Sequence, residues 1–93
     1  MKYQVKRTTS FKKSFKRLIK NRNFDKNNFM RVVNILSKGE LLDGKYLDHK
    51  LNGFKIETRE CHLQNDILLV YRHEDNILTL YLLDIGSHSE LFK

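Results

Sequence analysis

The spacing of hydrophobic residues changes along the chain, and each change marks an expected element. Tyr3 and Val5 alternate with polar residues, so residues 2–7 are predicted to form a short strand. Thr8, Thr9 and Ser10 then offer side chains that can cap a helix. The next apolar residues recur at helical spacing and face lysines and arginines on the opposite side: Phe11, Phe15, Leu18 and Ile19.

A second helix is expected after the turn at residues 21–23. Asp25 can cap its first turn, because a carboxylate accepts the free amide hydrogens there and its charge suits a helix N-terminus. Gly39 suits the residue just beyond its end. Between them lies one apolar stripe, formed by Phe29, Val32, Val33 and Leu36. The pattern therefore predicts two antiparallel helices joined by a short turn.

The second half of the chain is typical of strands. Residues 40–53 are polar and are predicted to be a loop, and residues 54–62 alternate as a strand does. Two later segments, 66–72 and 77–83, are apolar on both faces, which favours central positions in a sheet. Residues 73–76 would form the hairpin turn between them, and 87–92 a short helical turn or tail.

The element order is thus β-α-α-β-β-β, which belongs to the α+β class. The last three strands would form an antiparallel meander, and the two helices would pack on one face of the sheet. We expect residues 1–93 to form a single domain, because the chain is short and contains no proline and no low-complexity linker.

The charge is asymmetric. The net charge is +7, residues 1–22 hold nine Lys or Arg, and all eleven acidic residues lie from Asp25 onward. Such a basic half attracts polyanions, and a solvated surface that merely keeps the protein soluble is the alternative. Nucleic acid is favoured over membrane, because the basic helix lacks a large apolar face and tryptophan.

Several classes of protein are disfavoured. No apolar run is long enough to span a bilayer, and no apolar core follows the basic N-terminus as it would in a signal peptide, so a cytoplasmic location is expected. The single cysteine, Cys61, excludes an internal disulfide and suits a reducing compartment. We expect Cys61 to be buried on its strand; a catalytic thiolate is the alternative.

Histidines supply the candidate chemistry. Alternation along a strand places Glu60 and His62 on one face, and Arg59 and Cys61 on the other. Three further residues could reach the same place: His49 from the preceding loop, Asp66 from the start of the next strand, and His88 from the last strand's end. These side chains could also suit Zn²⁺, although no tight ligand spacing is present. His73 is expected to be solvated in the hairpin turn.

At these residues the chain resembles the YafQ branch of the RelE/ParE toxin superfamily. The resemblance is carried by four blocks, which are specific in combination: Asp48-His49-x-Leu51-x-Gly53, Arg59-Glu60-Cys61-His62, Asp66-x-Leu68-Leu69-Val70-Tyr71 and Gly86-Ser87-His88-Ser89-Glu90-Leu91-Phe92. The resemblance implies a RelE-like fold and a toxin of a type II toxin–antitoxin system. It further implies an endoribonuclease that cuts mRNA in the ribosomal decoding site by attack of the RNA 2′-OH, with no metal or other cofactor.

The resemblance also implies roles for individual residues. His49 and His88 match the family's general base and general acid, whereas His62 and Asp66 match supporting residues and Glu60 an acidic position beside them. Phe92 matches an aromatic residue that helps hold the substrate base. Two histidines suit this reaction, because one group must accept the 2′-OH proton and another must protonate the 5′-oxygen.

The chain departs from the family at two positions. Asp84 stands where well-known members carry an arginine that neutralises the phosphate, and Ile67 stands where some carry tryptophan. Another cation would have to replace the arginine. The nearby candidates for substrate binding are Arg59, Lys50 and Lys55, whereas Arg72 is predicted to lie too far along its strand from Asp66.

Three partners follow from the resemblance and the charge. They are mRNA in the decoding site, ribosomal RNA bound by the basic N-terminal half, and an acidic antitoxin resembling DinJ or RelB. The alternative function is a non-catalytic toxin or binding module resembling ParE, which acts on a protein target such as gyrase. Such a binder has no need for the histidines.

Overall fold

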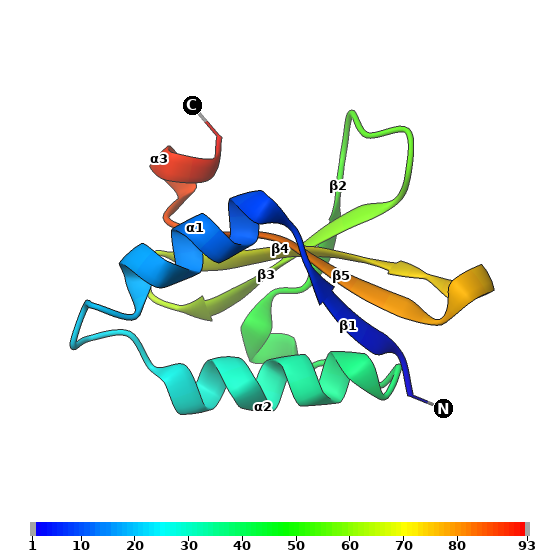
Figure 1. Cartoon of the computed structure of the whole chain (residues 1–93), viewed down its shortest axis with the longest axis horizontal. Helices are drawn as coiled ribbons and strands as arrows, with labels where there is room; N and C mark the ends of the chain where they lie inside the picture. The colour runs from blue at the N-terminus through cyan, green and yellow to red at the C-terminus, as the bar shows by residue number, and fades with distance from the viewer. Residues whose placement is uncertain (1, 93) are drawn as a thin grey trace.

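A five-stranded sheet forms the centre of the molecule in the computed structural model, which describes residues 2–92 (Figure 1). Its strands, in the spatial order β1-β5-β4-β3-β2, are β1 (Gln4–Arg7), β5 (Thr79–Gly86), β4 (Ile67–Glu74), β3 (Thr58–Gln64) and β2 (His49–Leu51). The helices are α1 (Thr9–Leu18), α2 (Lys26–Ser37) and the short α3 (His88–Leu91), with 3₁₀ turns η1 (Gly44–Tyr46) and η2 (Asp75–Ile77).

The predicted α+β class and the antiparallel meander are confirmed. Strands β2, β3, β4 and β5 pair antiparallel in succession, and β1 adds to the outer side of β5 in parallel. The parallel pair makes the sheet mixed. It joins residues more than seventy positions apart, for example Gln4 and Thr79, so no local turn signal announces it.

Both predicted helix caps are present. The Thr8 hydroxyl accepts a hydrogen bond from the Phe11 amide (3.1 Å), and the Asp25 carboxylate accepts one from the Asn28 amide (3.0 Å). Gly39 follows α2 with a φ of +75°, a conformation that glycine adopts without strain. The two helices begin and end close to the predicted positions for these local reasons.

The core lies between the two long helices and one face of the sheet. Phe11 of α1 stacks on Phe29 of α2, with 6.0 Å between ring centroids. Every second residue of the central strands joins them: Cys61 and Leu63, Leu69 and Tyr71, Leu80 and Leu82. The predicted apolar stripes are therefore core. The opposite face of the sheet carries the intervening residues, among them Glu60 and His62.

Three boundaries differ from the sequence prediction. The predicted loop 40–53 contains η1 and the three-residue strand β2, which is too short and polar to give an alternating signal. Strand β3 begins at Thr58, because residues 54–57 are exposed. Strands β4 and β5 extend to Glu74 and Gly86, so the hairpin turn is η2 rather than residues 73–76.

Candidate active site

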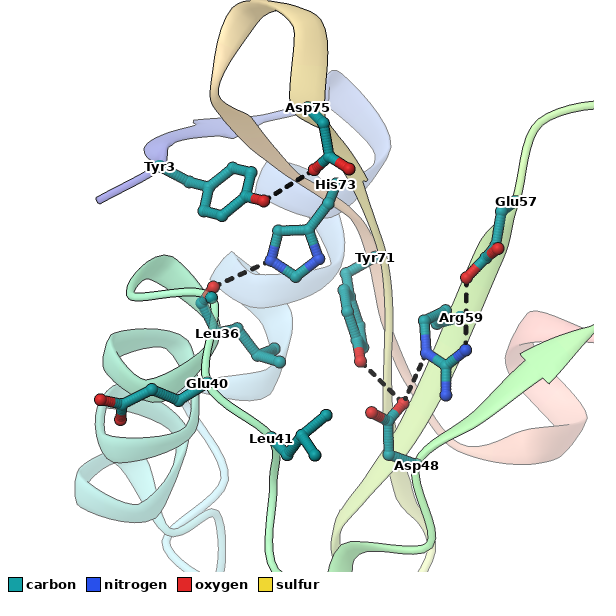
Figure 2. Close-up of a pocket in the computed structure, with 11 residues that line it drawn as sticks. Tyr3, Leu36, Glu40, Leu41, Asp48, Glu57, Arg59, Tyr71, His73 and Asp75 are labelled. Atoms are coloured by element: carbon teal, nitrogen blue, oxygen red, sulfur yellow. Dashed lines mark hydrogen bonds and ion pairs between the residues drawn. The ribbon is translucent and has the colours of Figure 1, made fainter. Parts of the chain in front are cut away.

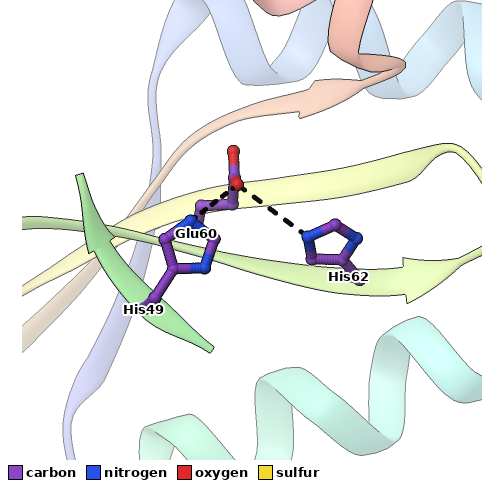
Figure 3. A group of neighbouring side chains, drawn as sticks. All are labelled: His49, Glu60 and His62. Atoms are coloured by element: carbon purple, nitrogen blue, oxygen red, sulfur yellow. Dashed lines mark ion pairs between the residues drawn. The ribbon is translucent and has the colours of Figure 1, made fainter. Parts of the chain in front are cut away.

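Strand pairing brings two histidines to one buried carboxylate. His49 on β2 lies opposite Glu60 on β3, and His62 follows Glu60 on the same face of β3. Both imidazoles point at one carboxylate oxygen (Figure 3): His49 Nε2 lies 3.0 Å from Glu60 Oε2, and His62 Nε2 lies 3.9 Å from it. The prediction that Glu60 and His62 share a face is confirmed.

The contacts of His49 determine where a hydrogen lies between His49 and Glu60. His49 Nδ1 lies 2.7 Å from the carbonyl oxygen of Leu47, which can only accept, so Nδ1 carries a hydrogen. A neutral His49 would then present a lone pair at Nε2 to a carboxylate oxygen, which is also an acceptor. A proton must therefore lie between Nε2 and Oε2. The two groups form an imidazolium–carboxylate pair, or share that proton as one unit.

The second oxygen of Glu60 is buried and unpaired among the described residues. The Glu60 side chain is only 7% exposed, whereas those of His49 and His62 are 49% and 35% exposed. Glu60 Oε1 is buried and has no hydrogen-bond partner in the described part of the chain. An unpaired buried acceptor costs stability. Such an atom is useful only if a hydrogen-bond donor on a bound molecule reaches it.

Asp48 holds the strand that carries His49. Its carboxylate accepts a hydrogen bond from the Tyr71 hydroxyl (2.7 Å) and another from Arg59 Nε (3.3 Å), inside a cavity of about 530 Å³ (Figure 2). Burial and the adjacent Asp48 carboxylate raise the pKa of Tyr71, so it stays a donor. Sequence reasoning placed Asp48 and Tyr71 in the resemblance blocks but assigned them no role.

A second group lies where β5 ends. His88 is the first residue of α3, and its amide nitrogen lies 3.4 Å from Asp66 Oδ1. Ser87 and Glu90 cap this helix reciprocally. The rings of His88 and Phe92 lie 5.2 Å apart, and both side chains are exposed. The predicted site residue Asp66 therefore contacts the backbone of His88, and no hydrogen bond or ion pair joins it to His62 among the described residues.

The register relates the two groups. His62, Leu68 and Gly86 form one row across β3, β4 and β5, so the turn leading to His88 begins two strand spacings, about 10 Å, from His62. In Figure 1, α3 lies above the central strands and α2 below them, while β2 is the edge strand beside β3. The exposed side chain of His88 thus follows β5, two strand positions from β3, which carries His62.

The expected phosphate-binding cations lie elsewhere. Arg59 is on the opposite face of β3 from Glu60, where it pairs with Asp48 and Glu57 at 3.3 Å each. Lys50 lies opposite Arg59 in the register and so faces the same way. Lys55 is exposed in the loop between β2 and β3. Side chains alternate between the two faces of a strand. Arg59 and Lys50 therefore point away from the site, because their neighbours Glu60 and His49 face it.

Asp84 is accommodated without a cation. Its Oδ1 accepts hydrogen bonds from the Ser14 hydroxyl of α1 (2.7 Å) and from the amide of Ile85 (2.8 Å). A bulge in β5 between Leu82 and Asp84 accompanies this arrangement. The Asp84 side chain is therefore hydrogen-bonded to α1. Ile67 is half-buried and packs against the core.

Cys61 and His73 both lie in the interior of the sheet or at its contact with α2, outside the candidate site. Cys61 is fully buried, as expected, and burial raises the pKa of its thiol to about 12, so it is not a nucleophile. The prediction for His73 is wrong. It lies in β4, its Nε2 donates to the Leu36 carbonyl (2.8 Å), and its ring packs 4.4 Å from that of Tyr3. It joins β4 to the end of α2.

Comparison with known proteins identifies the family. The sequence profile described as the bacterial toxin of type II toxin–antitoxin systems, YafQ, matches residues 3–93. The chain belongs to the YafQ toxin family. No curated protein matches the sequence. Among the described residues, no helix is long and apolar enough to cross a membrane.

Solved structures agree with this family. A metal-bound toxin from Helicobacter pylori is 42% identical, with 97% of this chain and 99% of that one covered and a TM-score of 0.91. YafQ in the Escherichia coli DinJ–YafQ toxin–antitoxin complex is 26% identical over the whole of both chains, with a TM-score of 0.85. YafQ from E. coli BL21(DE3) is 26% identical over 98% and 99%, with a TM-score of 0.84.

Proposed function

We propose that this YafQ family toxin is a ribosome-dependent endoribonuclease that cuts mRNA in the decoding site. The observation that carries the proposal is the contact of His49 with the buried, half-unpaired carboxylate of Glu60, with His62 beside it. A proton-sharing pair with an unpaired acceptor oxygen suits removal of a proton from a sugar hydroxyl. The RNA 2′-OH is such a hydroxyl and is absent from DNA.

The reaction is written as an internal displacement. The 2′-oxygen forms a bond to the adjacent phosphorus while its proton passes to Glu60 Oε1, the unpaired oxygen of the His49–Glu60 pair. The bond from phosphorus to the 5′-oxygen breaks, and His88 gives that oxygen a proton. The products are a 2′,3′-cyclic phosphate and a 5′-OH end. Proton transfer by each positioned group contributes roughly 10²–10⁴-fold.

The remaining residues take supporting roles. Asp66 holds the first turn of α3 at the His88 amide, and thereby places the acid. Phe92 lies beside the His88 ring and can stack on a substrate base. His62, next to Glu60, would donate a hydrogen bond to the phosphate. We assign it this role because Asp84, which stands where other members have arginine, is bound to α1.

The same three side chains can also bind a metal. One ligand atom from each of His49, Glu60 and His62 lies within 4.8 Å of the others. The H. pylori relatives are described as metal-bound and copper-bound. Imidazole and carboxylate ligands suit Zn²⁺ and Cu²⁺. Because the metal would displace the proton that His49 and Glu60 share, and would hold the pair that accepts the substrate proton, we propose that it inhibits cleavage.

An antitoxin and a cytoplasmic location complete the proposal. The E. coli relative is described in complex with DinJ, and a protein of net charge +7 suits an acidic antitoxin. The exposed lysines of α1, among them Lys12, Lys13 and Lys16, suit ribosomal RNA. Ribosomes and mRNA meet in the cytoplasm.

Expression in a bacterial host without antitoxin tests the function. The wild type should arrest growth and translation, and mapping of mRNA 5′ ends should show new cuts within translated codons. His88→Ala should abolish both effects at equal protein level. The alternative, a toxin like ParE acting on gyrase, requires DNA damage without new RNA ends, and that result would refute the nuclease.

A further inference from the structure

A groove opens over the outer edge of β3, directly beside His62. Strand β2 pairs only with residues 58–60 of β3, so residues 61–64 of β3 have no strand beside them at this edge. The residues of α2 and η1 form the opposite wall, and the cavity has a volume of about 540 Å³, which is ample for a nucleotide. His62 lines this groove and also faces Glu60, so the groove adjoins the candidate active site.

The wall of the groove is held rigidly by Asn28 of α2. Its Oδ1 accepts hydrogen bonds from the Tyr46 hydroxyl (2.8 Å) and from Arg31 (3.2 Å), and its Nδ2 donates to the Leu63 carbonyl (2.7 Å). One amide thus joins α2, η1 and β3. Leu47, whose carbonyl accepts a hydrogen bond from His49 Nδ1, also lines the groove. The groove and the histidines are therefore parts of one framework.

Two cations face this groove. Arg31 uses one of its nitrogens to contact Asn28, and the guanidinium keeps further donors. Lys45 lies with its ammonium 5.3 Å from the centre of the Tyr46 ring. Asp25 is the acidic residue of the lining, and its carboxylate caps α2 at the Asn28 amide. Both cations are exposed and can move toward a ligand.

We propose that this groove is a subsite for the RNA strand beside the cleaved bond, in which Arg31 and Lys45 bind one neighbouring phosphate. The proposal rests on the nuclease function above and assigns it a second phosphate site. An RNA strand whose reacting phosphate lies between the His49–Glu60 pair and His88 would continue past His62 into the groove. Arginine suits bidentate contact with phosphate, and lysine adds a mobile charge.

The test uses ribosomes programmed with a short mRNA and the full-length toxin. The variant Arg31→Gln/Lys45→Gln should raise the half-saturating toxin concentration roughly three- to tenfold, the size expected for two exposed ionic contacts, and leave the maximal rate within about twofold. The control Lys26→Gln/Lys38→Gln removes the same charge at the two ends of α2, outside the groove, and it should change the half-saturating concentration less than twofold.

A neutral methylphosphonate in the mRNA distinguishes substrate phosphate from ribosomal RNA. Placed at one phosphate flanking the cleaved bond, it should weaken the wild type about as much as the double variant is weakened, and should weaken the double variant no further. If every methylphosphonate weakens both proteins equally, or the control equals the double variant, the subsite is refuted while the nuclease stands. A wild type that cuts no mRNA refutes both.

Discussion

Replacing Glu60 by glutamine should lower activity without lowering stability. Glu60→Gln keeps the shape of the side chain but removes the charge that keeps a proton on His49 Nε2, 3.0 Å away. The amide nitrogen of glutamine can donate a hydrogen bond to Nε2, so the lone pair of Nε2 is then occupied. Neither member of the pair could then take the 2′-OH proton.

The magnitudes follow from burial. A hydrogen bond to a charged group contributes about 1.5–3 kcal/mol, and the half-exposed His49 (49%) favours the lower end for the contact itself. Loss of the general base adds a larger kinetic effect, so the cleavage rate should fall roughly 100-fold or more. The free energy of unfolding should stay the same or rise by about 1 kcal/mol, because a buried carboxylate with one unpaired oxygen is removed.

The assay is single-turnover cleavage of mRNA on programmed ribosomes, with urea unfolding measured on the same samples. Glu57→Gln is the matched control, because that carboxylate is 59% exposed and lies outside the site; it should keep full activity. Wild-type cleavage by Glu60→Gln would refute the proton-sharing pair. A loss of activity matched by a loss of stability would show that Glu60 acts only in folding.

Three other expectations can be checked on the isolated protein or on programmed ribosomes. Tyr71→Phe removes the hydroxyl that holds Asp48. The free energy of unfolding should fall by about 1 kcal/mol and the maximal cleavage rate by several-fold, with the half-saturating concentration unchanged. An unaltered rate would show that β2 does not need this hydrogen bond. Burial raises the pKa of Cys61 from 9.0 to about 12, so the folded state keeps a proton that the unfolded chain loses above about pH 9. Urea titrations should therefore show the free energy of unfolding falling by up to about 1.4 kcal/mol per pH unit above pH 9. The fall should be shallower in Cys61→Ala, and identical slopes would contradict the burial argument. Zn²⁺ or Cu²⁺ should inhibit cleavage and a chelator should restore it, with His62→Gln markedly less sensitive; stimulation by metal would contradict the metal-free reaction.

The sequence predicts the parts of this structure that local patterns encode. Helices α1 and α2 were found because a cap, an apolar stripe and, for α2, a terminal glycine agree. The core strands β4 and β5 were found because both faces are apolar. The pairing of β1 with β5 joins distant residues, and β2 spans only His49–Leu51, so neither leaves a periodic signal. Both depend on tertiary contacts.

The site shows the same division. Alternation along β3 correctly separated Glu60 and His62 from Arg59 and Cys61. It could not reveal that His49 lies on a strand paired with Glu60, so the position of Lys50 was also missed. His73 was misplaced, because a histidine next to acidic residues resembles a turn, whereas its contacts with Tyr3 and the Leu36 carbonyl come from elements distant in sequence.

The most direct test of the central claim is the chemistry of the cut itself. Ribosomes are programmed with an mRNA in which the nucleotide carrying the attacking oxygen is replaced by its 2′-deoxy form, and cleavage by the wild-type toxin is followed in time. The account predicts that normal mRNA yields a 2′,3′-cyclic phosphate and a 5′-OH end, and that the deoxy substitution abolishes the cut. Cleavage of the deoxy mRNA at the normal rate would contradict it.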